Sequence, residues 1–129
     1  MIRHAKYPLA EILPFICFGR PPMVKDNHRV PLGTKRLTVF KVKGTDCVTC
    51  GKKGTHFVLE SHIDMVDNPG TALQAHLNLY TEDDTLMTVD HIVALADGGA
   101  KDMTNLQPMC KPCNGEKSSN KDKEKRARL

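Results

Sequence analysis

The pattern of hydrophobic and polar residues predicts a mixture of short helices and strands. In residues 33–44, large apolar side chains lie three positions apart before a closing glycine, which favours a short helix. Residues 57–63 repeat large apolar side chains with a period of two, as a half-buried strand does, and Asn-Pro-Gly at 68–70 marks a turn. This part of the chain therefore predicts one helix followed by one strand.

Two more apolar segments flank a polar connection. The segments 76–80 and 86–92 are separated by Thr-Glu-Asp-Asp-Thr, an arrangement that is typical of a hairpin. A loop with Gly98 and Gly99 follows, and the second of two cysteine pairs is expected to lie at the start of a short helix. The predicted order of elements in this half is strand, strand, loop and helix.

The two ends of the chain predict less regular structure. Residues 1–32 contain five of the eight prolines and predict an extended arm, because proline restricts the backbone and removes a hydrogen-bond donor. The apolar run at 12–18 is too short to span a membrane, and no signal-peptide cleavage site follows it, so a cytoplasmic location is expected. Residues 119–129 are basic and predict a flexible tail.

Composition indicates one small domain with a modest core. A chain of 129 residues is long enough for a compact domain, but it has no tryptophan and only 5% aromatic residues. Residues 1–60 carry eleven Lys and Arg against four Asp and Glu, residues 61–100 carry none against seven, and residues 101–129 carry eight against four. Basic flanks around an acidic centre suit a protein that binds a polyanion outside and a cation inside, although an ordinary solvated surface has such charges too.

The cysteines are more specific. Cys47 and Cys50 form one CxxC pair, and Cys110 and Cys113 form another, with 59 residues between the pairs. Two such pairs can supply the four thiolates of one tetrahedral structural zinc site, and this is the interpretation we favour. A redox pair would need a thioredoxin-like setting that neither pair has, disulfides are unusual in a cytosolic chain, and independent thiols would not explain the repeated spacing. Cys17 stands apart and is expected to be a small buried residue.

Four polar residues near the second cysteine pair are candidates for chemistry. Asp90 and His91 end a predicted strand, Asn105 follows fourteen residues later, and Asn114 comes directly after the last cysteine. A zinc ion would fix the backbone of that asparagine. Neighbouring residues of a strand point to opposite faces, so Asp90 and His91 can share one site only where the strand ends or distorts.

These residues carry a family resemblance. The sequence "VDHIVALADGGAKDMTNLQPMCKPCNGEK", with "GTDCVTCG" upstream, resembles the core of zinc-stapled HNH endonucleases, and the wider segment is similar to small HNH proteins of bacteriophages. The resemblance covers about residues 36–118. It implies a small single-domain α+β fold with a ββα-metal core stapled by a four-cysteine zinc site, here an HNH nuclease domain at 33–118 after an extended arm at 1–32.

The resemblance also implies roles for the candidate residues. His91 would be the general base, Asp90 a metal ligand, Asn114 the second ligand, and Asn105 would hold the loop and the base in position. This chain departs from the common family pattern at Asn114, where histidine is frequent, and at Ala94, where proline is frequent. Two oxygen ligands favour Mg²⁺ or Mn²⁺ over Zn²⁺ or Ni²⁺ at the catalytic position.

The function expected from these features is that of a metal-dependent endonuclease acting on DNA, by nicking or double-strand cleavage. Lys117, one helical turn beyond Asn114, could contact a phosphate. No recognition helix or repeated DNA-reading unit is evident, so we expect weak sequence preference. The alternatives are a catalytically inactive zinc-stapled nucleic-acid-binding module and a zinc-held adaptor that binds protein.

The expected partner is DNA, with no membrane association. The similarity to bacteriophage HNH proteins suggests contacts with packaging or recombination proteins. For a phage-encoded chain, it also suggests a location in the host cytoplasm.

Overall fold

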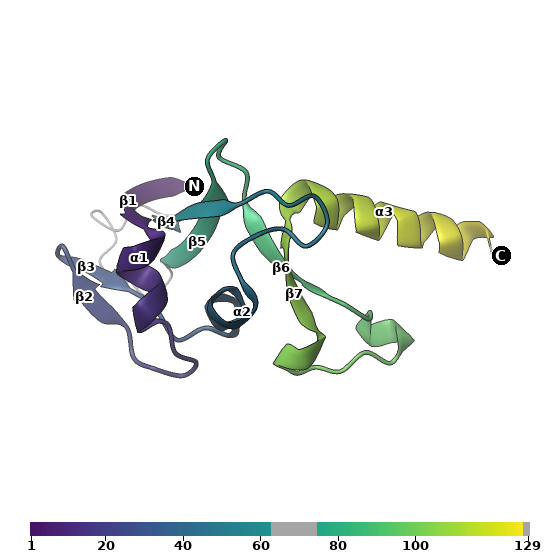
Figure 1. The fold of residues 1–129 in the computed structure, drawn as a ribbon, viewed down its shortest axis with the longest axis horizontal. Helices are drawn as coiled ribbons and strands as arrows, with labels where there is room; N and C mark the ends of the chain where they lie inside the picture. The colour runs from purple at the N-terminus through teal and green to yellow at the C-terminus, as the bar shows by residue number, and fades with distance from the viewer. Residues whose placement is uncertain (63–74, 128–129) are drawn as a thin grey trace.

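Helix α2 (Lys35–Lys43) lies between two antiparallel units in the computed structural model, which describes residues 1–62 and 75–127 (Figure 1). On one side, β1 (Ile2–Pro8), β4 (Gly54–Ser61) and β5 (His76–Thr81) form a sheet in the order β1–β4–β5. On the other side, β6 (Met87–His91) pairs with β7 (Leu106–Cys110). Helix α3 (Lys111–Ala127) follows β7 directly and extends away from the rest of the molecule (Figure 1).

The helix predicted over 33–44 is confirmed as α2. Thr34 caps its first turn, since the Thr34 hydroxyl accepts a hydrogen bond of 3.2 Å from the backbone N–H of Leu37. Gly44 ends the helix with φ 109°, a conformation that glycine adopts without strain. The predicted apolar face is also present, because Leu37 and Phe40 are buried in the core between the two antiparallel units.

The strands predicted at 57–63, 76–80 and 86–92 are present as β4, β5 and β6, but the hairpin between the last two is wrong. β5 pairs with β4, whereas β6 pairs with β7, and only an isolated bridge joins Tyr80 to Leu86. The polar connection therefore carries the chain from one sheet to the other. The turn expected at 68–70 lies outside the described residues.

Strand β7 was not predicted. Its central residue is Pro108, and proline within an apolar segment weighs against a strand because it cannot donate to the ladder. The two-stranded β6–β7 ribbon accommodates this residue opposite Val89. The order in this half is therefore strand, strand, loop, strand and helix.

The extended arm predicted for residues 1–32 is wrong. This segment contains β1, the short helix α1 (Leu9–Ile12), a 3₁₀ turn η1 (Leu13–Phe15), and the β2–β3 hairpin (Met23–Lys25 and His28–Val30). Prolines occupy the ends and turns of these elements, where a missing donor costs little.

The same segment supplies a large part of the core. Ile12, Ile16, Val30 and Leu32 are each fully buried in one cluster with core residues of α2, β4 and β5. Burial of such side chains contributes about 1.5–3 kcal/mol each, which explains why the segment folds onto the sheet. The division expected at residue 32 therefore does not separate two structural units.

Two smaller predictions also change. Cys17 is exposed, although its neighbour Ile16 is buried. The second cysteine pair lies at the start of a helix, as expected, but this helix is long and continues through the residues expected to form a flexible tail as far as Ala127. None of the helices within 1–62 and 75–127 has the length and hydrophobicity needed to cross a membrane. The predicted small α+β domain with four gathered cysteines is confirmed.

Candidate functional site

The β6–β7 loop, residues 92–105, is held by the side chain of Asn105. Its Oδ1 accepts a hydrogen bond of 2.8 Å from the N–H of Val93, and its Nδ2 donates to the carbonyls of Val93 and Ala100 at 2.8 and 2.9 Å. Asn105 is buried, with 7% of its surface exposed. One carboxamide therefore joins the beginning, the far side and the end of the loop that follows His91.

The two glycines of this loop are needed for different reasons. Gly98 has φ 89° and ends the 3₁₀ turn η3 (Leu95–Asp97) in the left-handed region. Gly99 lies so close to the carbonyl of Val93 and the carboxamide of Asn105 that a Cβ would overlap both. The Gly-Gly sequence thus permits the close approach on which the asparagine contacts depend.

Asp90 and Asn114 lie at the contact between β6 and α3. The Lys117 ammonium is 2.5 Å from Asp90 Oδ2 and donates to the His91 carbonyl at 2.7 Å, while Asn114 Nδ2 donates to Thr88 Oγ1 at 2.9 Å. Thr88 and Asp90 are two apart on one face of the strand, and Asn114 and Lys117 are three apart on one face of the helix. The structure thus brings Asp90, Asn114 and Lys117 to one interface.

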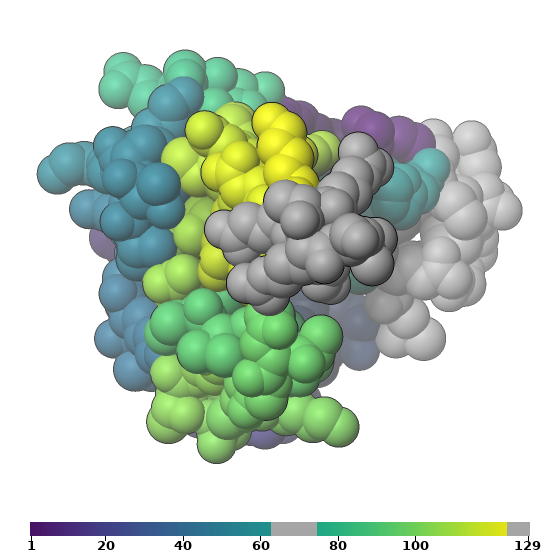
Figure 2. All heavy atoms as spheres, turned by 90° about the vertical axis from the view of Figure 1, so that its right-hand side faces the viewer, coloured from purple at the N-terminus to yellow at the C-terminus, as the bar shows by residue number. Residues whose placement is uncertain are grey.

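His91 lies at the same end of β6 as Asp90, but it lines a different part of the surface. It lines an open pocket of about 440 Å³ together with residues of β6, β7, α2 and the β6–β7 loop. The Lys117 side chain lines a different pocket, beside Cys113 on α3. In the part of the chain that the structure describes, the His91 ring has no hydrogen-bond partner. Figure 2 shows the side of the molecule on which the loop (green) and α3 (yellow) meet.

The four predicted cysteine ligands form one cluster. The Sγ atoms of Cys47, Cys50, Cys110 and Cys113 all lie within 4.8 Å of one another, and those of Cys50 and Cys110 are 3.7 Å apart. Cys47 and Cys110 are buried. Four thiols at this separation can hold a metal ion, and the cluster joins the first CxxC loop to the end of β7 and the first turn of α3.

Thiol ionisation in the cluster is uneven. Burial opposes ionisation of Cys47, but backbone N–H groups around it, first that of Cys50, lower its pKa to about 6. The neighbouring Cys110 thiol, burial and the other two sulfurs raise the pKa of Cys113 to about 12. Ionisation is therefore easier at Cys47 than at Cys113.

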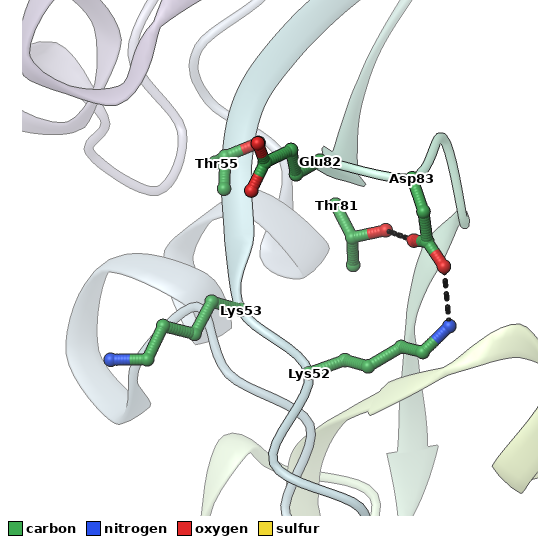
Figure 3. Close-up of a pocket in the computed structure, with 6 residues that line it drawn as sticks. All are labelled: Lys52, Lys53, Thr55, Thr81, Glu82 and Asp83. Atoms are coloured by element: carbon green, nitrogen blue, oxygen red, sulfur yellow. Dashed lines mark hydrogen bonds and ion pairs between the residues drawn. The ribbon is translucent and has the colours of Figure 1, made fainter.

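The first CxxC loop is fixed to its surroundings by backbone and side-chain contacts. The N–H of Val48 donates to the carbonyl of Pro108 at 3.1 Å, which ties the loop to β7. The Lys52 ammonium donates to Asp83 Oδ2 at 2.7 Å, and the hydroxyl of Thr81 donates to the same carboxylate, as Figure 3 shows. The loop is therefore held from both β7 and the β5–β6 connection.

Comparison with protein families identifies the segment that contains these residues. The family model of HNH endonucleases matches residues 77–120, from β5 into α3. Residues 77–120 are thus similar to an HNH endonuclease domain, and we refer to them as the HNH domain. No curated protein and no solved structure matches the chain. The match confirms the predicted family resemblance, and an HNH domain indicates nuclease activity on a nucleic acid.

The HNH domain includes every residue predicted from the polar pattern but only one of the two cysteine pairs. Asp90, His91, Asn105 and Asn114 lie inside the matched segment, whereas Cys47 and Cys50 lie before it. The sequence did not point to Thr88, whose hydroxyl orients Asn114, or to the cations around His91. Thr88 lies two residues before Asp90 on the same face of the strand, which is a local signal; the cations of α2 have no comparable local signal.

Proposed function

We propose that this protein is a metal-dependent endonuclease that hydrolyses phosphodiester bonds of DNA, with weak sequence preference. The observation that carries the proposal is the end of β6, where Asp90 faces α3 and His91 faces an open cationic pocket. The HNH match and the Asn105-held loop support the same assignment. Nicking of one strand requires one such site, whereas double-strand cleavage requires two chains or two encounters.

His91 would act as the general base. A phosphodiester resists attack because its negative oxygens repel the nucleophile, so a water molecule must lose a proton as it attacks. A neutral imidazole can accept that proton near pH 7. The water oxygen then bonds to phosphorus, the bond from phosphorus to the 3′ oxygen breaks, and the departing oxygen takes up a proton. Asn105 would position the base by holding the loop that begins directly after it.

Asp90 and Asn114 would hold the catalytic cation. In the described structure, Oδ1 of each residue has no hydrogen-bond partner, and both belong to the β6–α3 interface. The Lys117 ammonium at Asp90 shows that this position accommodates positive charge. Oxygen donors favour Mg²⁺ or Mn²⁺, which would supply positive charge for the phosphate and for the departing oxygen. Lys117 itself could then turn to a neighbouring phosphate.

The cysteine cluster would hold one structural zinc ion. A regular tetrahedron with Zn–S bonds of about 2.3 Å places its sulfur atoms about 3.8 Å apart. The 3.7 Å between the Cys50 and Cys110 sulfurs agrees with this separation. Zinc would thereby fix the start of α3 and, with it, Asn114.

One observation favours a second candidate function. Because Lys117 already neutralises Asp90, the domain could bind DNA without a catalytic cation, as a zinc-stapled nucleic-acid-binding module that has lost catalysis. Such a module would bind DNA equally well with and without Mg²⁺ and would leave it intact.

Nicking of supercoiled plasmid DNA separates the two functions. The purified protein is incubated with plasmid in Mg²⁺, in Mn²⁺ and in EDTA, and relaxed and linear products are measured with time. An endonuclease converts the plasmid in Mg²⁺ or Mn²⁺ and stops in EDTA. Binding of the plasmid with no conversion in either metal would identify the inactive module instead.

A further inference from the structure

The pocket beside His91 carries positive charge from two separate parts of the chain. Lys35 and Arg36 come from the first turn of α2, and Lys101 comes from the β6–β7 loop. Residues of β6 and β7 complete the lining: Thr88, Val89, His91 and Leu106. Within residues 1–62 and 75–127, no carboxylate lines this pocket. We call it the cationic pocket.

The cations of the pocket are held in place by backbone contacts. The Lys35 ammonium donates to the carbonyl of Lys101 at 3.0 Å, and Arg36 Nη2 donates to the carbonyl of Leu77 at 3.1 Å. Arg36 is half-buried, and burial lowers the pKa of its guanidinium against the opposing effect of Glu60. These contacts bring the first turn of α2 up to the β6–β7 loop and to β5.

The two lysines of the pocket lack ion-pair partners. Among the residues that the structure describes, Lys35 and Lys101 form no ion pair, although other lysines of the chain pair with carboxylates. The nearest acid in sequence, Asp102, is occupied: hydrogen bonds from the Thr104 side chain and backbone lower its pKa, with a smaller effect of Lys35. Clustered cations without a counter-charge attract an anionic ligand.

We propose that the cationic pocket binds the phosphate backbone of duplex DNA beside the bond that is cut, so that Lys35 and Lys101 each contact a phosphate next to the one that faces His91. This rests on the proposed function, and it adds a part of the substrate site that lies outside the HNH domain, since Lys35 precedes residue 77. Helix α2 would then serve two purposes. Its apolar face packs in the core, and its first turn holds DNA.

Binding of a fluorescently labelled DNA duplex, measured by anisotropy in EDTA at several salt concentrations, tests the proposal without cleavage. Lys35→Gln and Lys101→Gln are compared with Lys6→Gln, which removes the same charge from an exposed lysine of β1. Each pocket variant should bind about 5- to 10-fold more weakly at 0.1 M salt and lower the slope of log K against log salt by about 1. Lys6→Gln should bind like the wild type.

Lys101→Gln keeps the test independent of folding, because the Lys101 side chain is exposed and forms no hydrogen bond or ion pair within the described structure. Thermal unfolding of all three variants checks that each is folded. Pocket variants that bind DNA with the affinity and salt slope of Lys6→Gln would overturn the proposal, as would a wild type that does not bind DNA.

The outcome is distinguishable from that of the proposed function. If wild-type protein nicks plasmid but the pocket variants bind normally, the cationic pocket is wrong and the nuclease assignment stands. If the pocket variants lose affinity and salt dependence but no protein nicks DNA with Mg²⁺ or Mn²⁺, the DNA contact stands and the nuclease assignment fails.

Discussion

The carboxamide of Asn105 is matched to its position at the level of single atoms. It must accept one hydrogen bond from the Val93 N–H and donate two, to the carbonyls of Val93 and Ala100. Aspartate, which is nearly the same size, has no donor for the two carbonyls when ionised, and a serine is too short to reach across the loop. Only an amide provides both functions here, and this explains why the resemblance to the family includes this residue.

Asn105→Ala should unfold or loosen the β6–β7 loop. The substitution removes three hydrogen bonds to part-buried backbone groups of Val93 and Ala100, so we expect a loss of about 2–4 kcal/mol in the free energy of unfolding. Urea unfolding measures the loss. Asn120→Ala on the exposed surface of α3 is the control and should change stability little. If the two variants had the same stability, the loop would not depend on Asn105.

At the scale of elements, the β5–β6 connection replaces the hairpin expected from the sequence. Asp83 accepts hydrogen bonds from Lys52 and from the hydroxyls of Thr81 and Thr85. These donors, first Lys52, hold the pKa of its carboxyl below the usual 3.8. The ionised carboxylate thus keeps the connection in a shape that leads from one sheet into the other and keeps the first CxxC loop close by.

The stabilising effect of Asp83 should depend on pH. Since the folded state lowers the pKa of this carboxyl, its contribution is present above the usual pKa of 3.8 and disappears as the pH falls through the folded-state value. Asp83→Asn should therefore lower the melting temperature at pH 7, and its difference from the wild type should shrink at more acid pH. Melting curves across that range measure this, with the exposed Glu82→Gln as control. A difference that does not vary with pH would mean that the carboxylate charge is unimportant.

The elements that the sequence predicted are those with a clear local signal. Helix α2 has an apolar face and a closing glycine, and β4, β5 and β6 have alternating apolar residues. Strand β7 was missed because Pro108 stands at its centre, and β1 and α1 were missed because prolines surround them. In both cases, tertiary contacts determine the secondary structure, because β7 pairs with β6 and β1 pairs with β4. The prolines mark positions where a backbone hydrogen bond is missing. They do not mean that regular structure is absent around them.

At the scale of the whole molecule, the cysteine cluster joins three segments of the chain. It connects the first CxxC loop, the end of β7 and the first turn of α3. The core on the other side of α2 is formed largely by the N-terminal segment and the three-stranded sheet. The position of α3 against β6, and with it the approach of Asn114 to Thr88, therefore depends on the cluster.

Cys47→Ser should remove the metal ion and destabilise the β6–β7–α3 side. Structural zinc sites contribute on the order of 10 kcal/mol, which is comparable to the net stability of a small domain. We expect one zinc per wild-type chain by elemental analysis and less than one in Cys47→Ser, together with a lower melting temperature. Cys17→Ser, which alters an exposed cysteine outside the cluster, should keep both values. Wild-type protein without zinc but with an intact fold would contradict the assignment.

The candidate site could be predicted as far as its residues are close in the sequence. Asp90, His91, Asn105 and Asn114 lie within 25 consecutive residues whose spacing is distinctive. The structure shows further that Asn114 of α3 contacts Thr88 of β6, and that Lys117 of α3 contacts Asp90. The cationic pocket could not be predicted, since α2 reaches His91 only through the packing of Leu37 and Phe40 in the core.

DNA cleavage by the His91→Ala variant tests most directly the central assignment, which is that His91 is the general base of an endonuclease. Nicking of supercoiled plasmid in Mg²⁺ is measured for the wild type, for His91→Ala and for His28→Ala, which removes a histidine from the β2–β3 hairpin. Because His91 would take the proton from the attacking water, His91→Ala should nick about 10²- to 10⁴-fold more slowly while keeping its melting temperature and its DNA affinity in EDTA. His28→Ala should nick at the wild-type rate. A His91→Ala protein that nicks as fast as the wild type at neutral pH would contradict the assignment of His91 as the base.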